Sequence, residues 1–255
     1  MCLILFAWDV HPVYRLVVAA NRDEFHARPT APAAYWPEAP GLLAGRDLAG
    51  GGSWFGITRQ GRFAALTNYR DPASHGPEAP SRGGLVTGFL LGDQPPVAWL
   101  TAVARQGAAY NGFGLLCGDL RDLWYHSNRG GPPAAVSPGI HGLSNHVLDT
   151  PWPKVVRGTA ALEQVLQAPA VDPEALFALL ADRTPAPDGL LPGTGVSLAW
   201  ERLLSPLFID AEGYGTRSST VLLVGRDGEI FFAERSFAAE AVPGATAIFR
   251  FRAES

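Results

Sequence analysis

The sequence predicts an α+β fold in which two antiparallel sheets lie face to face and helices cover their outer sides, a four-layer α/β/β/α sandwich. Strand-like segments come as successive hairpins, and helix-like segments are grouped between the hairpins rather than alternating with single strands. The chain has 255 residues, of which 47% are hydrophobic and 17% charged. This length can bury a large core, and we expect one domain over residues 1–255.

The first part of the chain is expected to contain two hairpins separated by a long loop. Residues 2–8 are an apolar run and residues 14–25 resume after a His-Pro-Val turn, so these segments are expected to pair. Residues 26–52 are rich in proline and are expected to form a loop. The glycines at its end lack a following Lys-Ser or Lys-Thr, which favours a turn over a phosphate-binding loop. Residues 54–69 carry apolar runs on both sides of Arg-Gln-Gly-Arg, which indicates the second hairpin.

The rest of the chain groups helix-like and strand-like segments. Asp172 followed by Pro173 is typical of a helix start, with aspartate as the cap and proline in the first turn. Residues 183–197 are rich in proline and glycine and are expected to form a surface loop. Helices are expected at 82–91, 95–106, 150–167 and 172–183, and strands at 110–120, 123–127, 217–237 (a third hairpin) and 245–254.

Charge and composition narrow the classes of function. A net charge of −4 and a pI near 5.9 give no electrostatic case for a nucleic-acid partner or an anionic membrane surface. No apolar run approaches the roughly 18 residues of a membrane helix, and no secretory signal is recognisable. We expect a soluble, cytoplasmic protein without stable membrane insertion; the pattern indicates no oligomeric state. Cys2 and Cys117 are too few for a disulfide framework. Lys154 is the only lysine, and we attribute the near-exclusive use of arginine to compositional bias.

Cys2 is the first candidate for chemistry because it directly follows the initiator methionine. Removal of a methionine before a small second residue would leave a chain that begins with both a thiol and a free α-amine. An α-amine has a pKa of about 7.7–8.0, so it can accept the thiol proton as a general base. Nucleophile and base would then come from one residue. A buried structural cysteine is the alternative, and position alone does not decide.

The second strand ends in the polar sequence Asn21-Arg22-Asp23-Glu24. Arg22 near Cys2 could lower the pKa of the thiol, and Asp23 could hold the α-amino group. Neighbouring side chains of a strand point to opposite faces, so Arg22 and Asp23 share one pocket only where a bulge or twist intervenes. The parity of a regular strand instead pairs Asn21 with Asp23, or Arg22 with Glu24. Solvated charges at an exposed strand end are the alternative.

Three further polar residues lie at the ends of predicted elements. Asn68 ends the second hairpin, Asn145 lies in the sequence Gly-Leu-Ser-Asn-His, and Arg217 enters the third hairpin. Asparagine amides are neutral N–H donors suited to a developing oxyanion. Each asparagine alone is equally typical of a turn or a cap.

Ordered blocks over nearly the whole chain resemble the family named for its Asn-Arg-Asp-Glu motif, the Transport and Golgi organisation protein 2 family. The blocks are MCLILF, LVVAANRDEFHARP, GGGSWFGIT, AALTNYR, SRGGLV, YNGFGLL, NRG, GLSNHVLDTPWPK and GYGTRSSTVLLV. They extend from residue 2 to beyond residue 220, which makes the resemblance highly specific. It implies a role in haem trafficking or in lipid and acyl-CoA homeostasis, and no established reaction.

A remoter resemblance is to the N-terminal-nucleophile hydrolases of the bile-salt hydrolase and penicillin V acylase type. Those enzymes also begin with cysteine after a removed methionine and cleave linear amides in an α/β/β/α sandwich. The matching positions here are Cys2, Arg22, Asp23, Asn68, Asn145 and Arg217. Those hydrolases carry Arg-Asn-x-Asp where this chain has Asn21-Arg22-Asp23, so Asn21 is a substitute candidate for Arg22. Their substrate loops differ, and no bile-salt or penicillin specificity is implied.

The first functional hypothesis is therefore a hydrolase that needs no cofactor and acts on a small or lipid-like molecule. Cys2 would attack an amide or thioester carbonyl with its own amine as base. Asn68 and a backbone N–H would stabilise the oxyanion. Asp23, Asn145 and Arg217 would orient the amine and the substrate.

The second hypothesis is binding without cleavage, because a fold does not fix a function. The same pocket would hold haem or an acyl lipid, and of the six histidines His146 is, with Cys2, the first candidate haem ligand. A vestigial pocket in an interaction protein is the third alternative. It is disfavoured because several polar residues occur together in the expected order.

Overall fold

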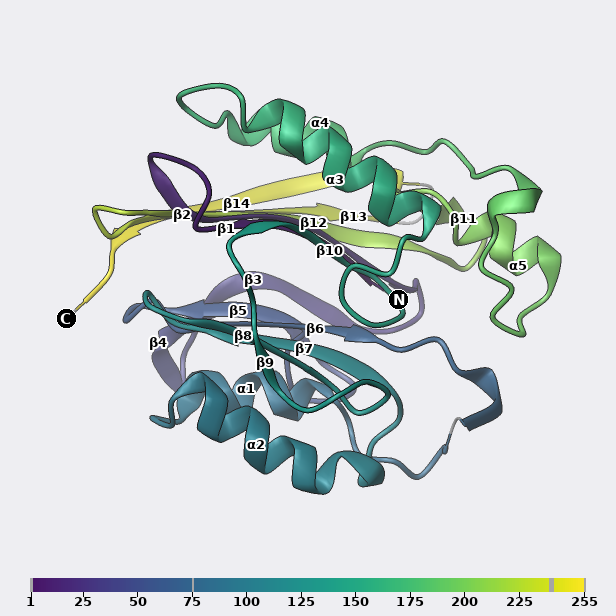
Figure 1. The fold of residues 1–255 in the computed structure, drawn as a ribbon, viewed down its shortest axis with the longest axis horizontal. Helices are drawn as coiled ribbons and strands as arrows, with labels where there is room; N and C mark the ends of the chain where they lie inside the picture. The colour runs from purple at the N-terminus through teal and green to yellow at the C-terminus, as the bar shows by residue number, and fades with distance from the viewer. Residues whose placement is uncertain (1, 75, 239–240, 255) are drawn as a thin grey trace.

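Two antiparallel sheets lie face to face in the computed structural model, with helices on the outer side of each (Figure 1). The structure describes residues 2–74, 76–238 and 241–254. The predicted four-layer α/β/β/α arrangement is confirmed. Neighbouring strands in both sheets run antiparallel throughout these residues, as the hairpin pattern of the sequence predicts.

The first sheet has the strand order β10-β1-β2-β12-β13-β14, and β11 pairs with β12. Its strands are β1 (Cys2–Trp8), β2 (Tyr14–Phe25), β10 (Gly139–Leu143), β11 (Asp210–Ala211), β12 (Tyr214–Gly225), β13 (Glu229–Phe237) and β14 (Pro243–Arg252). Helices α3 (Pro153–Val165) and α4 (Pro173–Leu180) cover its outer face (Figure 1).

The second sheet has the strand order β3-β4-β5-β6-β7-β8-β9. Its strands are β3 (Thr30–Trp36), β4 (Ala39–Asp47), β5 (Phe55–Thr58), β6 (Phe63–Asn68), β7 (Phe113–Gly118), β8 (Leu123–Ser127) and β9 (Ala134–Ala135). Helices α1 (Gly83–Leu91) and α2 (Pro96–Gln106) cover its outer face (Figure 1). The remaining elements are α5 (Leu198–Leu203) and 3₁₀ turns at Pro72–Ser74, Gly107–Ala109 and Asp188–Leu190.

Strand β1 is buried on both faces, which explains its continuous apolar sequence. Ile4 and Phe6 belong to the core between the two sheets, together with Cys2. Leu3 and Leu5 point the other way and pack in the cluster beneath α3 and α4. A strand in this position presents its first side chain to the space between the sheets, where the core ends.

The expectation of a loop over residues 26–52 is wrong, because β3 and β4 form a hairpin there. Prolines dominate the composition of the segment, but Pro32 lies in an edge strand at a register irregularity, where a missing N–H costs no ladder hydrogen bond. Leu43 packs in the core between the sheets, and Leu42 points the other way, toward α1 and α2, so both faces of β4 are buried at this point. The glycine-rich end of the segment is a turn, as predicted, with Gly51 at φ 74°.

The three predicted hairpins and the four predicted helices are present. The carboxylate of Asp172 accepts a hydrogen bond of 3.0 Å from the backbone N–H of Glu174, which confirms the predicted cap of α4. Strand β10 and helix α5 were not predicted, because each has no more than six residues and no long periodic pattern. Within the described residues, no helix combines the length and apolar character needed to cross a membrane.

Candidate functional site

The Cys2 thiol lies at the rim of the core between the sheets and lines a cavity of about 460 Å³. Cys2 is 7% exposed and stands opposite Arg22 in the register of β1 and β2. Its backbone carbonyl accepts a hydrogen bond of 3.4 Å from the hydroxyl of Ser144, just after β10. The first residue of β1 is therefore held between β2 and the segment that follows β10.

The cavity is built where strands of both sheets end. The end of β2 contributes Arg22 and Asp23, and the end of β6 contributes Asn68. The turn between β4 and β5 and the segment that leads into α1 close the other sides. Four of the six predicted site residues, Cys2 among them, thus border one space.

A bulge lies opposite Arg22 and Asp23. Asp23 pairs with Thr216 and Arg22 with Ser218, so Arg217 is an extra residue in β12. A bulge of this kind increases the local twist of the strands. Strand parity requires a bulge or twist for Arg22 and Asp23 to share one pocket. A bulge is present in β12, the strand that pairs with β2, and Arg22 and Asp23 both line the cavity.

Asn21 points away from the cavity into the layer of α4. Its amide donates hydrogen bonds of 2.9 Å to the carbonyls of Leu180 and Leu207, and its carbonyl accepts one of 2.6 Å from Ser219. The side chain is fully buried and its hydrogen-bonding groups are occupied. This placement argues against Asn21 as a substitute for Arg22.

Asn145 lies behind Asn68 instead of bordering the cavity. Its side-chain amide donates a hydrogen bond of 3.0 Å to the backbone carbonyl of Asn68, and the hydroxyl of Ser144 donates to its carbonyl at 3.3 Å. Asn145 is 0% exposed. Any effect of this residue on a substrate in the cavity is therefore indirect, through Asn68 or through Ser144, whose hydroxyl also contacts the carbonyl of Cys2.

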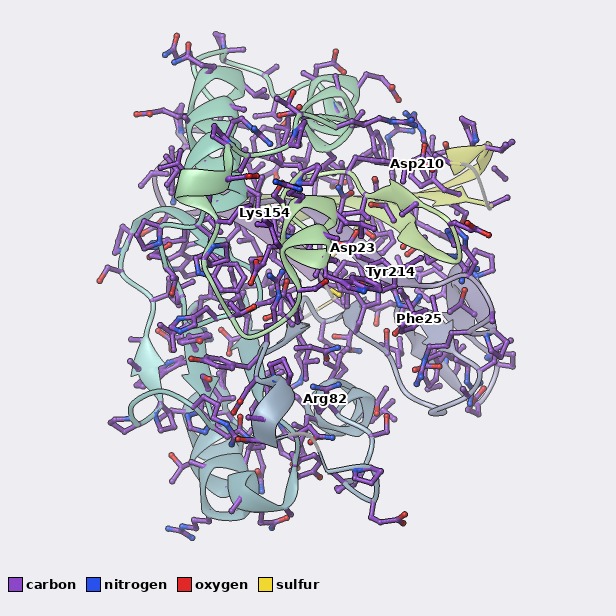
Figure 2. The ribbon with its side chains drawn as sticks, turned by 90° about the vertical axis from the view of Figure 1, so that its right-hand side faces the viewer. Asp23, Phe25, Arg82, Lys154, Asp210 and Tyr214 are labelled. Carbon is purple, nitrogen blue, oxygen red and sulfur yellow. The ribbon has the colours of Figure 1, made fainter. Side chains whose placement is uncertain are left out.

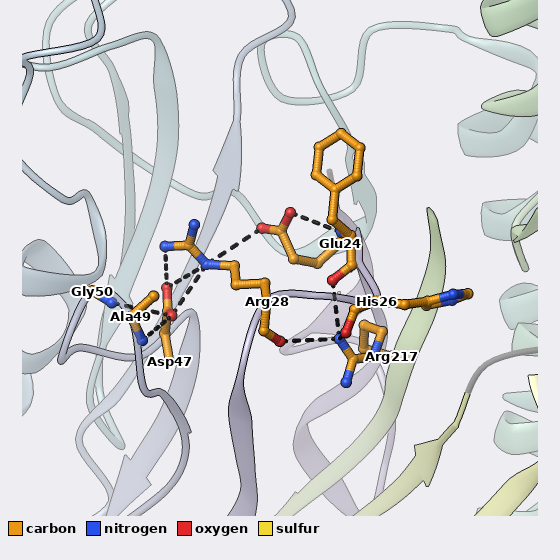
Figure 3. A network of polar contacts seen from close by, with 8 residues as sticks. Glu24, His26, Arg28, Asp47, Ala49, Gly50 and Arg217 are labelled. Atoms are coloured by element: carbon orange, nitrogen blue, oxygen red, sulfur yellow. Dashed lines mark hydrogen bonds and ion pairs between the residues drawn. The ribbon is translucent and has the colours of Figure 1, made fainter. Parts of the chain in front are cut away.

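Arg217 lies outside the cavity around Cys2 and borders a neighbouring one. Its Nη1 donates to the backbone carbonyls of Phe25, His26 and Arg28 at 3.0, 3.1 and 3.2 Å (Figure 3). These bonds hold the chain that follows β2, which is the outer wall of the Cys2 cavity. Arg217 was expected to orient the amine and the substrate together with Asp23 and Asn145; in this geometry it holds the chain after β2 and does not line the cavity around Cys2.

The same wall contains an ion pair that connects it to the β4–β5 turn. Arg28 Nη2 contacts the carboxylate of Asp47 at 2.7 Å, and Asp47 also accepts from the N–H groups of Ala49 and Gly50 (Figure 3). These contacts lower the pKa of Asp47 against the opposing effect of burial. Asp47 therefore stays ionised and fixes the turn.

Arg82 is a site residue that the sequence analysis missed. It lies immediately before α1, borders the cavity, and donates a hydrogen bond of 2.8 Å to the carbonyl of Gly112. Burial lowers its pKa, while a charge on Cys2 would raise it. Arg82 belongs to the Ser-Arg-Gly-Gly-Leu-Val block, and this block indicates the family resemblance but not by itself a role for the arginine.

Lys154 is the second missed residue. It lies in the first turn of α3, is 2% exposed, and its Nζ has no hydrogen-bond partner among the described residues. Burial lowers its pKa to about 8, and the nearby Asp23 carboxylate opposes that shift. Figure 2 shows Lys154 and Asp23 at the same end of the molecule, with Arg82 below them.

Burial dominates the electrostatics of the two central groups. It raises the pKa of the Cys2 thiol, with Asp23 adding to the shift and Arg22 opposing it. It also raises the pKa of Asp23, where the Lys154 charge and a hydrogen bond of 2.7 Å from Thr216 oppose it. Thiolate and carboxylate therefore disfavour each other, and the cations around them reduce that penalty.

A buried ion pair lies behind the site. Arg70 and Glu201 are 5% and 4% exposed at their side chains, with 2.9 Å between Nη1 and Oε2. Glu201 also accepts hydrogen bonds from the N–H and the hydroxyl of Thr194. Helix α5 and the loop before it are thereby tied to the segment that follows β6.

The histidine named as a haem-ligand candidate is occupied on both ring nitrogens. His146 contacts the hydroxyl of Tyr69 at 2.6 Å and that of Thr150 at 2.8 Å. In the described part of the chain, no cluster of three or more His, Cys, Asp or Glu side chains could hold a metal ion.

The two stacked sheets and their outer helices define the fold of the chain. The fold is of the N-terminal-nucleophile hydrolase type. A crystal structure of a mutant conjugated bile acid hydrolase from Clostridium perfringens matches with a TM-score of 0.52, over 99% of this chain and 92% of that one. The sequences are 8% identical, so this likeness concerns the fold alone.

The chain belongs to the Transport and Golgi organisation 2 family, whose model matches residues 1–239. The human Transport and Golgi organization protein 2 homolog is 38% identical over 92% of this chain and 93% of its own length. The Drosophila melanogaster Transport and Golgi organization protein 2 is 26% identical over 92% of each chain. The predicted family is confirmed.

Proposed function

We propose that this protein is a cysteine hydrolase of the N-terminal-nucleophile type that cleaves an amide or thioester bond of a small or lipid-like substrate. One observation carries the proposal. The Cys2 thiol borders a cavity with Arg22, Asp23 and Asn68, three of the residues that such chemistry requires. The β1–β2 hairpin brings Cys2, Arg22 and Asp23 together, and Asn68 reaches the same cavity from the second sheet.

The proposed reaction starts after removal of Met1. The free α-amine of Cys2 takes the thiol proton, and the thiolate attacks the substrate carbonyl. The side-chain amide of Asn68 donates to the resulting oxyanion. Collapse breaks the bond to the leaving amine or thiol, which receives the proton from the α-ammonium group, and water then hydrolyses the acyl-cysteine.

Intact mass and turnover test the proposal together. The mature chain is expected to lack Met1, and release of amine or thiol from a panel of fatty-acyl anilides and acyl thioesters is expected to be lost in Cys2→Ala. Cys117→Ala is the matched control, because Cys117 is 0% exposed and packs beneath α1 and α2. Turnover that survives Cys2→Ala, or a retained Met1, would contradict the mechanism.

Asn68→Ala gives a second, graded test. Loss of one oxyanion donor typically lowers kcat by about 10²–10³-fold. We expect that loss with little change in KM, because the oxyanion exists only after attack. A rise in KM with kcat unchanged would instead assign Asn68 to binding of the substrate in its ground state.

Binding without cleavage is the alternative proposal, supported by the same cavity and its buried thiol. Haem would then be a cargo ligated by Cys2, since both nitrogens of His146 are already engaged. A saturable Soret shift in a haem titration that disappears in Cys2→Ala, together with no turnover, would favour this alternative. An acyl-lipid cargo would instead be displaced competitively by fatty-acyl probes with no thiol involvement.

A further inference from the structure

Lys154 is an exception in both composition and position. It is the only lysine among 20 lysine and arginine residues, so every other basic position of the chain uses arginine. Compositional bias explains the arginines but not the exception. Lys154 is also among the largest fully buried side chains of the protein.

The surroundings of Lys154 suit an ammonium group better than a guanidinium. Its Nζ has no hydrogen-bond partner among the described residues, whereas an arginine would bring five N–H donors and a charge that it cannot give up. Lys154 also lies in the first turn of α3, at the positive end of the helix dipole. Only a lysine can lose its charge in such a place.

The charged groups that face Lys154 come from several elements. Asp23 is on β2, Cys2 on β1, and Arg70 follows β6. Glu201 of α5 acts through its ion pair with Arg70, and Trp152 lies against Arg70 with 4.8 Å from the guanidinium carbon to the ring centroid. Asp23 and Cys2 are the two acidic groups whose charges raise the pKa of Lys154, so they are the groups that its ammonium compensates.

We infer that Lys154 is a positioning residue of the site, a buried ammonium group that compensates the charges of the Asp23 carboxylate and the Cys2 thiolate from behind the cavity. It does not border the cavity around Cys2, so it acts on the reacting thiol and not on a substrate. The inference rests on the proposed function only in taking Cys2 as the reacting group.

Direct titration of Lys154 tests the first half of the inference. Because the chain has one lysine, protein made with ¹⁵Nζ- and ¹³Cε-labelled lysine, free of a lysine-containing tag, gives a single side-chain signal. We expect the pKa of Lys154 to be about 8, and to fall further in Asp23→Asn, because the Asp23 charge raises it. A midpoint at the ordinary value of 10.5, unchanged in Asp23→Asn, would overturn the inference.

Thiol alkylation tests the second half without a substrate. The rate of Cys2 alkylation by iodoacetamide, followed by intact mass against pH, reports the thiolate fraction. Lys154→Met is expected to lower the alkylation rate at pH 7.5, where an ammonium group with a pKa of about 8 is still mostly charged, by about three- to tenfold. Lys154→Arg is expected to restore the rate only in part, because it returns the positive charge but brings five N–H donors into a space that holds an ammonium group.

The matched control is Arg157→Met, which removes a charge from the same helix where it pairs with Asp182 at 2.8 Å. Its alkylation profile is expected to match that of the unmodified chain. A Lys154→Met profile that coincides with this control would overturn the inference, as would equal rates for the Met and Arg variants. Absence of turnover on every substrate would count against the hydrolase proposal alone, since neither readout depends on turnover.

Discussion

The side-chain amide of Asn145 donates a hydrogen bond of 3.0 Å to the backbone carbonyl of Asn68. The backbone carbonyl of Asn145 in turn accepts one of 2.8 Å from the N–H of Arg70. These two bonds join the segment after β10, in the first sheet, to the end of β6, in the second. Since β10 pairs with β1, they set the position of Asn68 relative to Cys2 across the space between the sheets.

Asn145→Ala is expected to lower the free energy of unfolding by about 1–3 kcal/mol, because it removes a fully buried amide and leaves the partly buried carbonyl of Asn68 without this donor. Urea unfolding measures the change. Gln164→Ala, on the exposed side of α3, is the control and should leave the midpoint unchanged. If Asn145→Ala were as stable as the control, the bond to Asn68 would contribute nothing to the connection between the sheets.

Glu201→Ala is expected to destabilise the fold by about 3–5 kcal/mol, because it leaves the Arg70 guanidinium buried without its carboxylate. Replacing both residues, as Arg70→Met with Glu201→Ala, should recover part of that loss. A double-mutant cycle in urea measures the coupling. A loss in the double variant equal to the sum of the two single losses would show that the pair is not coupled.

The control for this cycle lies on the same helix. Arg202 pairs with Asp188 at the surface, with side chains that are 53% and 54% exposed. Solvent screens such a pair, so Asp188→Ala should leave the unfolding midpoint unchanged. The contrast between the two pairs would assign the effect to burial and not to charge pairing as such.

The strand-end residues of the site could be predicted from the sequence, because hairpins bring their own ends together. Cys2 and Arg22 face each other through local pairing, and Asn68 ends its hairpin at the same edge. Arg82 and Lys154 could not be found this way. They reach the site from helices on opposite outer faces of the sandwich, and their approach depends on tertiary packing that no local pattern encodes.

The bulge at Arg217 marks a second limit of sequence reasoning. Strand parity correctly required an irregularity near Arg22 and Asp23, but parity does not say which strand carries it. The structure puts the extra residue in β12. Arg217 therefore points toward the chain after β2 and binds three carbonyls there. Arg22 and Asp23 line the cavity around Cys2.

Glu234 predicts a pH dependence of stability. It is 4% exposed and accepts a hydrogen bond of 2.7 Å from the N–H of Ala33, and burial raises its pKa above the ordinary value of 4.5. A raised folded-state pKa means that the protonated carboxyl stabilises the fold at low pH, and that this contribution is lost as pH rises above 4.5 through the folded value.

Glu234→Gln should therefore be more stable than the unmodified chain at pH 8, and the difference should shrink toward pH 4. Glutamine keeps an acceptor for Ala33 and carries no charge to bury. Urea midpoints of both proteins at the two pH values measure the effect. A constant difference across this range would mean that the pKa of Glu234 is the same in the folded and unfolded chains.

The contact between Gly52 and Gly83 determines how closely the β4–β5 turn approaches α1. A Cβ on Gly52 would lie 2.5 Å from the backbone carbon and 2.7 Å from the backbone oxygen of Gly83. Backbone atoms cannot rotate away, so Gly52→Ala should destabilise the fold by about 1–3 kcal/mol. Because Arg82 directly precedes Gly83, the shift should also move its guanidinium and lower the rate of Cys2 alkylation.

Gly84→Ala is the control, since no atom lies within 4 Å of its Cβ; alanine in a helix should leave stability unchanged or raise it by up to about 1 kcal/mol. Equal stabilities for the two variants would show that the turn yields and does not define the position of α1.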